Sequence, residues 1–140
     1  MANGDFEIII RAVFLRNGKI LFCKQKTENY YFLPGGHIEF GESAIDAIGR
    51  EVKEELGVAA SENSFIGAVE NIFSDEDGKH HELNLVFSVK LDRNEVESLE
   101  NHLEFAWVDL GNLESQTIYP IALKNSLIKW LEDGKIFWAS

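Results

Sequence analysis

The chain has 140 residues, of which 45% are hydrophobic and 11% aromatic, so we expect one folded domain over residues 1–140 rather than a disordered chain. Its formal net charge is −11, and because a surface of that sign repels polyanions, a long nucleic acid is not expected as a partner. No apolar run approaches the roughly 18 residues that suggest a membrane span, and no secretory signal is visible, so membrane association is not expected either.

The first part of the chain reads as short strands. Apolar, β-branched runs at residues 6–15 and 19–23 predict two strands, and Asn17-Gly18 between them predicts a hairpin turn, since both positions tolerate a positive φ. Another short strand is expected over residues 30–33. It should end in a loop at Pro34-Gly35-Gly36.

The hydrophobic period then changes to that of a helix over residues 43–56. Ser43 is the expected N-cap, with Asp46 three residues later, and Gly57 stands where a left-handed residue would end the helix. The apolar residues at helical spacing are Ile45, Ile48, Val52 and Leu56.

The rest of the chain mixes strands and helices. Without regular β-α-β alternation, this order predicts an α+β fold with a mixed sheet. The expected elements are strands at 65–73 and 82–91 joined by a turn over 74–79, a polar loop with some helix at 92–101, a strand at 105–110, a helix at 121–131 and a terminal strand at 136–138.

Three glutamates of the first predicted helix, Glu51, Glu54 and Glu55, fall on one arc about 100° wide beside its apolar stripe. Like charges at spacings of three and four destabilise a helix by roughly 0.2–0.5 kcal/mol per pair. A divalent cation would reverse that sign, because carboxylate oxygens are the ligands that magnesium and manganese prefer. The alternative interpretation is a solvated acidic face.

The surroundings of this arc favour a binding site. A strand, a glycine loop and an acidic helix follow one another, which makes a compact platform for phosphate and metal. The spacing resembles the Nudix box at each defined position. It runs from Gly36 through five residues to Glu42, through seven to Arg50-Glu51-Val52, and through one residue each to Glu54-Glu55 and Gly57-Val58.

The resemblance implies a fold and a reaction. The fold would be a Nudix α/β/α sandwich with a mixed sheet, in which a loop-helix-loop holds the box. The reaction would be hydrolysis of a pyrophosphate bond in a nucleoside diphosphate linked to another moiety, with Mg²⁺ as cofactor and Mn²⁺ as an alternative. Such ions neutralise phosphate oxygens and lower the pKa of water.

The resemblance also implies roles for single residues. Glu51, Arg50 and Glu54 would be catalytic, with Glu51 a candidate to activate water and Arg50 orienting a glutamate through an ion pair. Glu42 would tie the loop to the helix. The implied metal ligands are the Gly36 carbonyl, Glu51, Glu54 and Glu55, joined by a downstream glutamate, Glu100 or Glu104, with Glu82 as a further candidate.

Other residues are candidates for the substrate site. Arg11 and Lys24 are available cations for phosphates, and His37 either touches phosphate or belongs to the polar surface. His80-His81 either lines the cleft or lies on the surface. Cys23, the single cysteine, reads as a core residue and fits a reducing, cytoplasmic location. Three aromatic side chains could stack on a base: Phe32, Phe73 and Phe87.

The substrate is expected to be a small nucleotide, either a nucleoside triphosphate or a nucleotide sugar. Within the resemblance, the stretch Ile72-Phe73-Ser74-Asp75 lacks the proline or tyrosine that marks some subfamilies, which disfavours ADP-ribose and diadenosine polyphosphates. The alternatives are an RNA 5′-end pyrophosphohydrolase and a non-catalytic nucleotide-binding regulator. The sequence leaves the oligomeric state open, a homodimer included.

Overall fold

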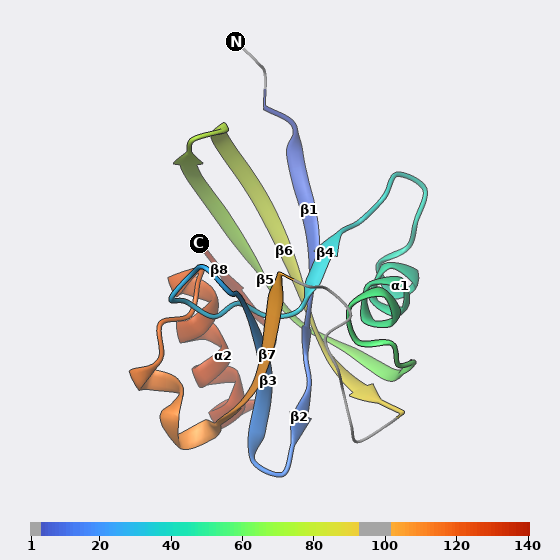
Figure 1. Cartoon of the computed structure of the whole chain (residues 1–140), viewed down its shortest axis with the longest axis vertical. Helices are drawn as coiled ribbons and strands as arrows, with labels where there is room; N and C mark the ends of the chain where they lie inside the picture. The colour runs from blue at the N-terminus through green and yellow to red at the C-terminus, as the bar shows by residue number, and fades with distance from the viewer. Residues whose placement is uncertain (1–3, 93–101) are drawn as a thin grey trace.

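The computed structural model describes residues 4–92 and 102–140 (Figure 1). In this part of the chain the helices are α1 (Ala44–Leu56) and α2 (Ile121–Asp133), and a 3-10 helix, η1 (Leu110–Ser115), precedes α2. The strands are β1 (Phe6–Val13), β2 (Leu15–Arg16), β3 (Lys19–Gln25), β4 (Gly35–His37), β5 (Ala60–Asp75), β6 (Gly78–Leu91), β7 (Leu103–Asp109) and β8 (Phe137–Ala139).

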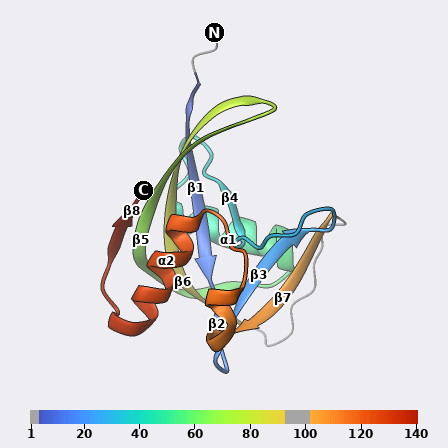
Figure 2. The ribbon, with the colours of Figure 1, turned by 90° about the vertical axis from the view of Figure 1, so that its left-hand side faces the viewer.

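The strands form two sheets that lie between α1 and α2, as Figures 1 and 2 show. In the larger sheet the order is β4-β1-β6-β5-β8, with β1 parallel to β6, β5 parallel to β8 and the other neighbours antiparallel. The smaller sheet is antiparallel, in the order β2-β3-β7. The predicted α+β sandwich with a mixed sheet is confirmed.

Each helix packs on its own hydrophobic core, and β1 contributes to both. Ile10 and Ala12 belong to the cluster that includes Ile48 of α1, whereas Val13 belongs to the cluster that includes Leu123 of α2. Side chains of a strand alternate between its two faces, so one strand can supply two cores. The polar residues of β1 and β6 that face α2 are therefore placed by the same alternation.

The predicted caps of α1 are confirmed. The Ser43 hydroxyl oxygen accepts a hydrogen bond from the Asp46 backbone N–H at 3.1 Å. Gly57 ends the helix in the left-handed region, at φ 69°, and its N–H donates to the Lys53 carbonyl at 3.0 Å. Both ends of the helix are thus fixed locally, which fixes the direction in which its acidic side points.

The glycine loop is the clearest correction. Gly35 and Gly36 were expected to form a loop with Pro34, yet they begin β4, which pairs with β1. A Cβ atom at Gly35, where φ is 153°, would overlap the Ile10 carbonyl oxygen, so the strand can approach β1 only because this residue has no side chain. Gly35 therefore serves close strand pairing rather than a free turn.

Several strand boundaries also differ from expectation. Residues 6–15 do not form one strand, because the chain leaves the larger sheet after Val13 and enters the smaller one at Leu15. The turn at Asn17-Gly18 is confirmed, with φ of 51° and 74°. Residues 30–33 form only isolated bridges, which join Phe32 to Cys23 and Tyr31 to Ile118.

Strands β5 and β6 and helix α2 are longer than predicted. The turn expected over 74–79 is shorter, because β5 and β6 extend to Asp75 and Gly78 and the Asp75 carboxylate accepts a hydrogen bond from the Asp77 N–H at 2.8 Å. The helix η1 had no counterpart in the sequence reading. The loop predicted at 92–101 lies outside the described residues from 93 onward.

Among the described residues, no helix has the length and apolarity needed to cross a membrane.

Candidate active site

Arg50 joins the loop before α1 to the helix itself. Its Nε and Nη2 donate to the two carboxylate oxygens of Glu42 at 2.7 and 2.9 Å, and Nη2 also donates to the His37 carbonyl at 3.1 Å. The hydrogen bond from Arg50 lowers the pKa of Glu42 to about 2, and the same contact raises the pKa of Arg50. The predicted ion pair between loop and helix is therefore present, in the two-pronged geometry that arginine favours.

Glu51 lies against the backbone of Gly36. A Cβ atom added at Gly36 would overlap the Glu51 carboxylate, so only glycine leaves room for it. Arg50 Nη1 donates to Glu51 Oε1 at 2.9 Å, and the Glu51 side chain is 15% exposed. Burial raises the pKa of Glu51, while the guanidinium of Arg50 opposes that shift. β4 and α1 thus bring together two residues that the Nudix resemblance named as metal ligands.

The other two glutamates of the arc differ in exposure. Glu54 is 56% exposed and lies 3.5 Å from Arg50 Nη1, whereas Glu55 is buried and shares a hydrogen bond with Glu51. A buried carboxylate needs a cation or donors nearby to stay charged. One turn of α1 therefore carries a buried, a half-buried and an exposed carboxylate on the same side.

The donor set of this turn fits a hard divalent cation. Carboxylate oxygens at three positions, with a peptide group beside one of them, supply the oxygen ligands that Mg²⁺ prefers. In residues 4–92 and 102–140, no three acidic, histidine or cysteine side chains have already converged on one point, and Arg50 occupies one oxygen of Glu51. The residues that would hold the ion are Gly36, Glu51, Glu54 and Glu55.

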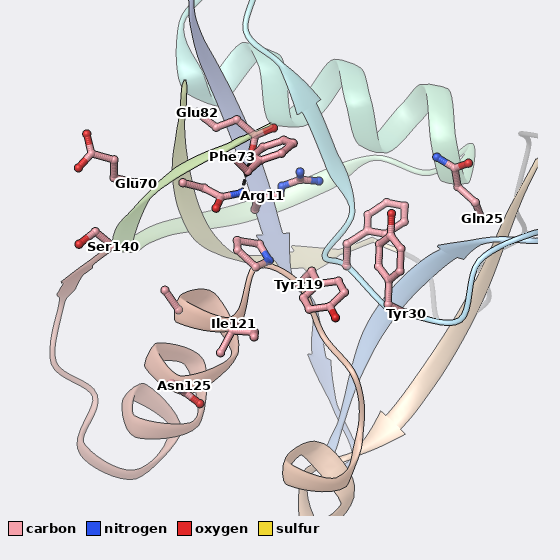
Figure 3. Close-up of a pocket in the computed structure, with 14 residues that line it drawn as sticks. Arg11, Gln25, Tyr30, Glu70, Phe73, Glu82, Tyr119, Ile121, Asn125 and Ser140 are labelled. Atoms are coloured by element: carbon pink, nitrogen blue, oxygen red, sulfur yellow. Dashed lines mark hydrogen bonds between the residues drawn. The ribbon is translucent and has the colours of Figure 1, made fainter. Parts of the chain in front are cut away.

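A cleft of about 810 Å³ opens on the α2 side of the larger sheet (Figure 3). Its walls combine aromatic rings with amide and charged side chains, the composition of a site for a small polar ligand with a ring system. Two tyrosines, Tyr30 and Tyr119, stand with their ring centroids 5.0 Å apart. Among the aromatic candidates, Phe32 and Phe73 line the cleft, while Phe87 is buried in the core beneath α1.

Arg11 is the cation among the residues that line the cleft, and its predicted contact with a phosphate stays a prediction. Its Nε donates to Asn84 Oδ1 at 3.1 Å, its Nη1 donates to the Leu33 carbonyl at 3.0 Å, and the guanidinium lies 5.9 Å from the centre of the Phe32 ring. Burial lowers the pKa of Arg11, and the negative charges of Glu82, Glu55 and Glu51 oppose that shift. Its charge therefore acts on both the cleft and the acidic turn of α1.

Lys24, the second predicted cation, lies outside this cleft. Its Nζ forms an ion pair with Glu104 Oε2 at 3.7 Å between β3 and β7. Glu104, a candidate metal ligand, is therefore paired with a lysine of the smaller sheet. Glu100, the alternative downstream glutamate, lies outside the described residues. Glu82, the third candidate, lines the cleft.

Three histidines, His37, His80 and His81, do not line the cleft. His37 Nε2 contacts Glu7 at 3.0 Å, and only its carbonyl reaches the box, through Arg50. His80 bridges Glu7 and Asp75, and His81 contacts Glu70 at 2.7 Å. Neither His80 nor His81 lines the cleft, so the surface interpretation is favoured for both.

Some cleft residues were missed by sequence reasoning. Tyr30, Tyr119 and Asn125 come from three separate segments that only the fold brings together. Asn84, which contacts the cleft residues Arg11 and Glu82, was also missed, because β6 carries several other polar residues and nothing in its pattern singles Asn84 out. Cys23 is buried as predicted, and burial raises the pKa of its thiol.

Comparison with known proteins matches the same region. The NUDIX domain description matches residues 7–131. The chain belongs to this family. Among curated Nudix relatives, a protein of Methanocaldococcus jannaschii named ADP-ribose pyrophosphatase is 29% identical over 109 residues. The aligned region covers 76% of this chain and 63% of that protein, so the chain spans less than two thirds of that relative.

Solved Nudix structures agree with the fold. A MutT NUDIX hydrolase from Burkholderia pseudomallei is 25% identical, covers 76% of this chain and 85% of that chain, and superposes with a TM-score of 0.67. A MutT protein from Methanosarcina mazei Go1 is 21% identical, covers 96% and 99% of the two chains, and has a TM-score of 0.74. At that identity the second likeness supports the fold alone.

Proposed function

We propose that this Nudix chain hydrolyses the pyrophosphate bond of a small nucleotide, a nucleoside diphosphate linked to a further group, with Mg²⁺ as cofactor. The observation that carries the proposal is the Glu51 carboxylate held against the Gly36 backbone, beside Glu54 and Glu55. The pyrophosphatase name of the archaeal relative supports the same reaction class. A non-catalytic regulator would not need this arrangement.

The chain's own groups have distinct tasks in this proposal. A bound divalent cation neutralises phosphate oxygens and acidifies water. Arg50 holds Glu51 in place through the Glu42 pair, so the carboxylate is oriented before substrate arrives. Glu51 would accept the proton of the attacking water, and Arg11 would bind a phosphate oxygen at the edge of the cleft.

The size and charge of the site support a free nucleotide as substrate. A cleft of about 810 Å³ is in the range of small-molecule sites. The net charge of −11 repels a long polyanion, and the described cleft offers one arginine and no lysine to offset it. A capped or triphosphorylated RNA is therefore the less favoured substrate.

The test is a panel of nucleoside triphosphates, nucleotide sugars and ADP-ribose, assayed with Mg²⁺ and in excess EDTA. We expect a nucleoside monophosphate as one product, loss of turnover in EDTA, and ¹⁸O from labelled water on a phosphate, because water attacks phosphorus. Full turnover in EDTA would refute the metal requirement. Efficient cleavage of triphosphorylated RNA without turnover of any free nucleotide would replace the proposal by RNA 5′-end processing.

A further inference from the structure

Two opposite charges stand in the cleft without pairing to each other. Arg11 on β1 and Glu82 on β6 both line it, and in the part of the chain that the structure describes no ion pair joins them. Instead, both contact the amide of Asn84. Arg11 Nε donates to Asn84 Oδ1 at 3.1 Å, and Asn84 Nδ2 lies 3.5 Å from Glu82 Oε1.

Asn84 is fixed where it separates them. Its side chain is fully buried, and its Nδ2 also lies within hydrogen-bonding distance, 3.4 Å, of the Val69 carbonyl on β5. An uncharged carboxamide can satisfy a cation at its oxygen and an anion at its nitrogen at once. It therefore contacts both the guanidinium and the carboxylate, which form no direct ion pair with each other.

The separation leaves one atom of each group open to a ligand. Among the described residues, Arg11 Nη2 has no hydrogen-bond partner, since the other nitrogens of its guanidinium bind Asn84 and Leu33. Glu82 Oε1 takes the contacts from Asn71, at 3.3 Å, and from Asn84, while Oε2 has no partner in the same part of the chain. In Figure 3 Arg11 stands among the lining residues, with Glu82 and Phe73 on one side of it.

We propose that Arg11 and Glu82, held apart by Asn84, bind the phosphate and the ribose hydroxyls of the nucleotide, so that the site selects ribonucleotides over 2′-deoxyribonucleotides. The inference rests on the proposed function. Guanidinium binds phosphate oxygens, whereas a carboxylate repels phosphate and accepts hydrogen bonds only. Between the phosphate and the base, the donors of a nucleotide are the ribose 2′- and 3′-hydroxyls, of which a 2′-deoxyribonucleotide keeps only one, and acidic side chains bind the 2′-hydroxyl in other nucleotide sites.

Binding of nucleoside monophosphates tests this without needing turnover. AMP and dAMP, and GMP and dGMP, are titrated into the whole chain in EDTA and followed by NMR shifts. We expect the ribonucleotide of each pair to bind about tenfold more tightly, the usual effect of a hydrogen bond to a charged group. Glu82→Ala should bring the ratio close to one, and Glu82→Gln should restore part of it.

Three variants separate the roles. Arg11→Lys should weaken both members of each pair equally and keep the ratio, since it alters only the phosphate contact. Asn84→Ala should lower both the affinity and the ratio, because Arg11 and Glu82 can then pair. Glu62→Ala, which removes an exposed glutamate of β5 paired with Lys90, is the matched control and should change neither.

The outcomes distinguish this inference from the proposed function. A ratio near one in wild-type protein, or an unchanged ratio in Glu82→Ala, overturns the inference even if triphosphates are hydrolysed. A loss of kcat in Glu82→Ala with unchanged ribose selectivity overturns it as well and assigns Glu82 to the metal centre. Selective binding without hydrolysis of any nucleotide supports the inference and refutes the proposed function.

Discussion

Charged side chains form ion pairs at the acidic turn of α1, whereas in the cleft beside α2 two opposite charges stay unpaired. At α1, one guanidinium holds the loop and the helix together, because Arg50 contacts Glu42, Glu51 and a loop carbonyl. In the cleft, a buried amide keeps Arg11 and Glu82 apart. The paired region is preorganised, and the unpaired region is open to a ligand. This division suits an enzyme in which the phosphates are common to all substrates and the rest of the ligand determines selectivity.

The largest effect should come from a glutamate on the acidic turn. Glu54→Gln keeps the size of the side chain and removes its charge, and we expect kcat to fall about a hundredfold or more, roughly 3 kcal/mol of transition-state stabilisation. The fold should persist, because Glu54 is 56% exposed, its 3.5 Å contact with Arg50 is a surface ion pair that contributes little, and the neighbouring glutamates repel it. Steady-state kinetics with saturating Mg²⁺ measure this.

A matched helix glutamate provides the control for that prediction. Glu132→Gln changes an exposed glutamate of α2 that lies outside the site and should leave kcat unchanged. Near wild-type activity in Glu54→Gln would show that the exposed member of the arc is not a metal ligand.

A smaller loss should follow from closing the space at Gly36. In Gly36→Ala the new methyl group would overlap the Glu51 carboxylate and push it aside, so we expect kcat to fall about tenfold, since small misplacements of a catalytic group are costly. Gly49→Ala is the contrast, because no atom lies within 4 Å of a Cβ there. It should keep full activity and stabilise α1 by about 0.5–1 kcal/mol.

Equal activities of Gly36→Ala and Gly49→Ala would show that the space at Gly36 is not needed for catalysis. The comparison also tests the paired region itself, because a carboxylate that could simply rotate away would tolerate the methyl group.

The Arg50–Glu42 pair should appear in the pH dependence of stability. The folded pKa of Glu42 is about 2, below its ordinary value of 4.5. Its contribution is therefore fully present above pH 4.5 and is lost as the pH falls toward 2. Glu42→Gln should melt at a lower temperature than wild type at pH 7, and the difference should close between about pH 4.5 and 2. A difference in melting temperature that stays constant over that range would show that protonation of Glu42 does not break its pair with Arg50.

The two regions also differ in how far the sequence predicts them. The helix, its caps and the acidic turn follow from local spacing, because Ser43, Gly57 and the glutamates act within one or two turns. Even the Arg50–Glu42 contact spans only eight residues. A regular local pattern therefore predicts both the element and its site.

The cleft depends on contacts between distant segments, and local pattern cannot supply them. Arg11 meets Asn84 across 73 residues of sequence, through the parallel pairing of β1 with β6. The role of Gly35 was misjudged for the same reason, since a glycine that permits close strand approach looks like a turn residue in sequence. Periodicity shows which face a residue occupies, but strand order decides what it meets.

The smallest effect is expected at a surface ion pair within the smaller sheet, between β3 and β7. The sequence predicted that Lys24 contacts phosphate, whereas its Nζ lies 3.7 Å from Glu104 Oε2, with the side chains 29% and 50% exposed. Such a pair contributes under about 1 kcal/mol and weakens with salt. Lys24→Ala should therefore lower the free energy of unfolding only slightly, less so at high salt, and leave the KM for nucleotide unchanged, because Lys24 does not line the cleft. Arg11→Ala should raise KM under the same conditions. A several-fold rise of KM in Lys24→Ala would instead place a second cation at the phosphates and weaken the contrast between the paired Lys24 and the open Arg11.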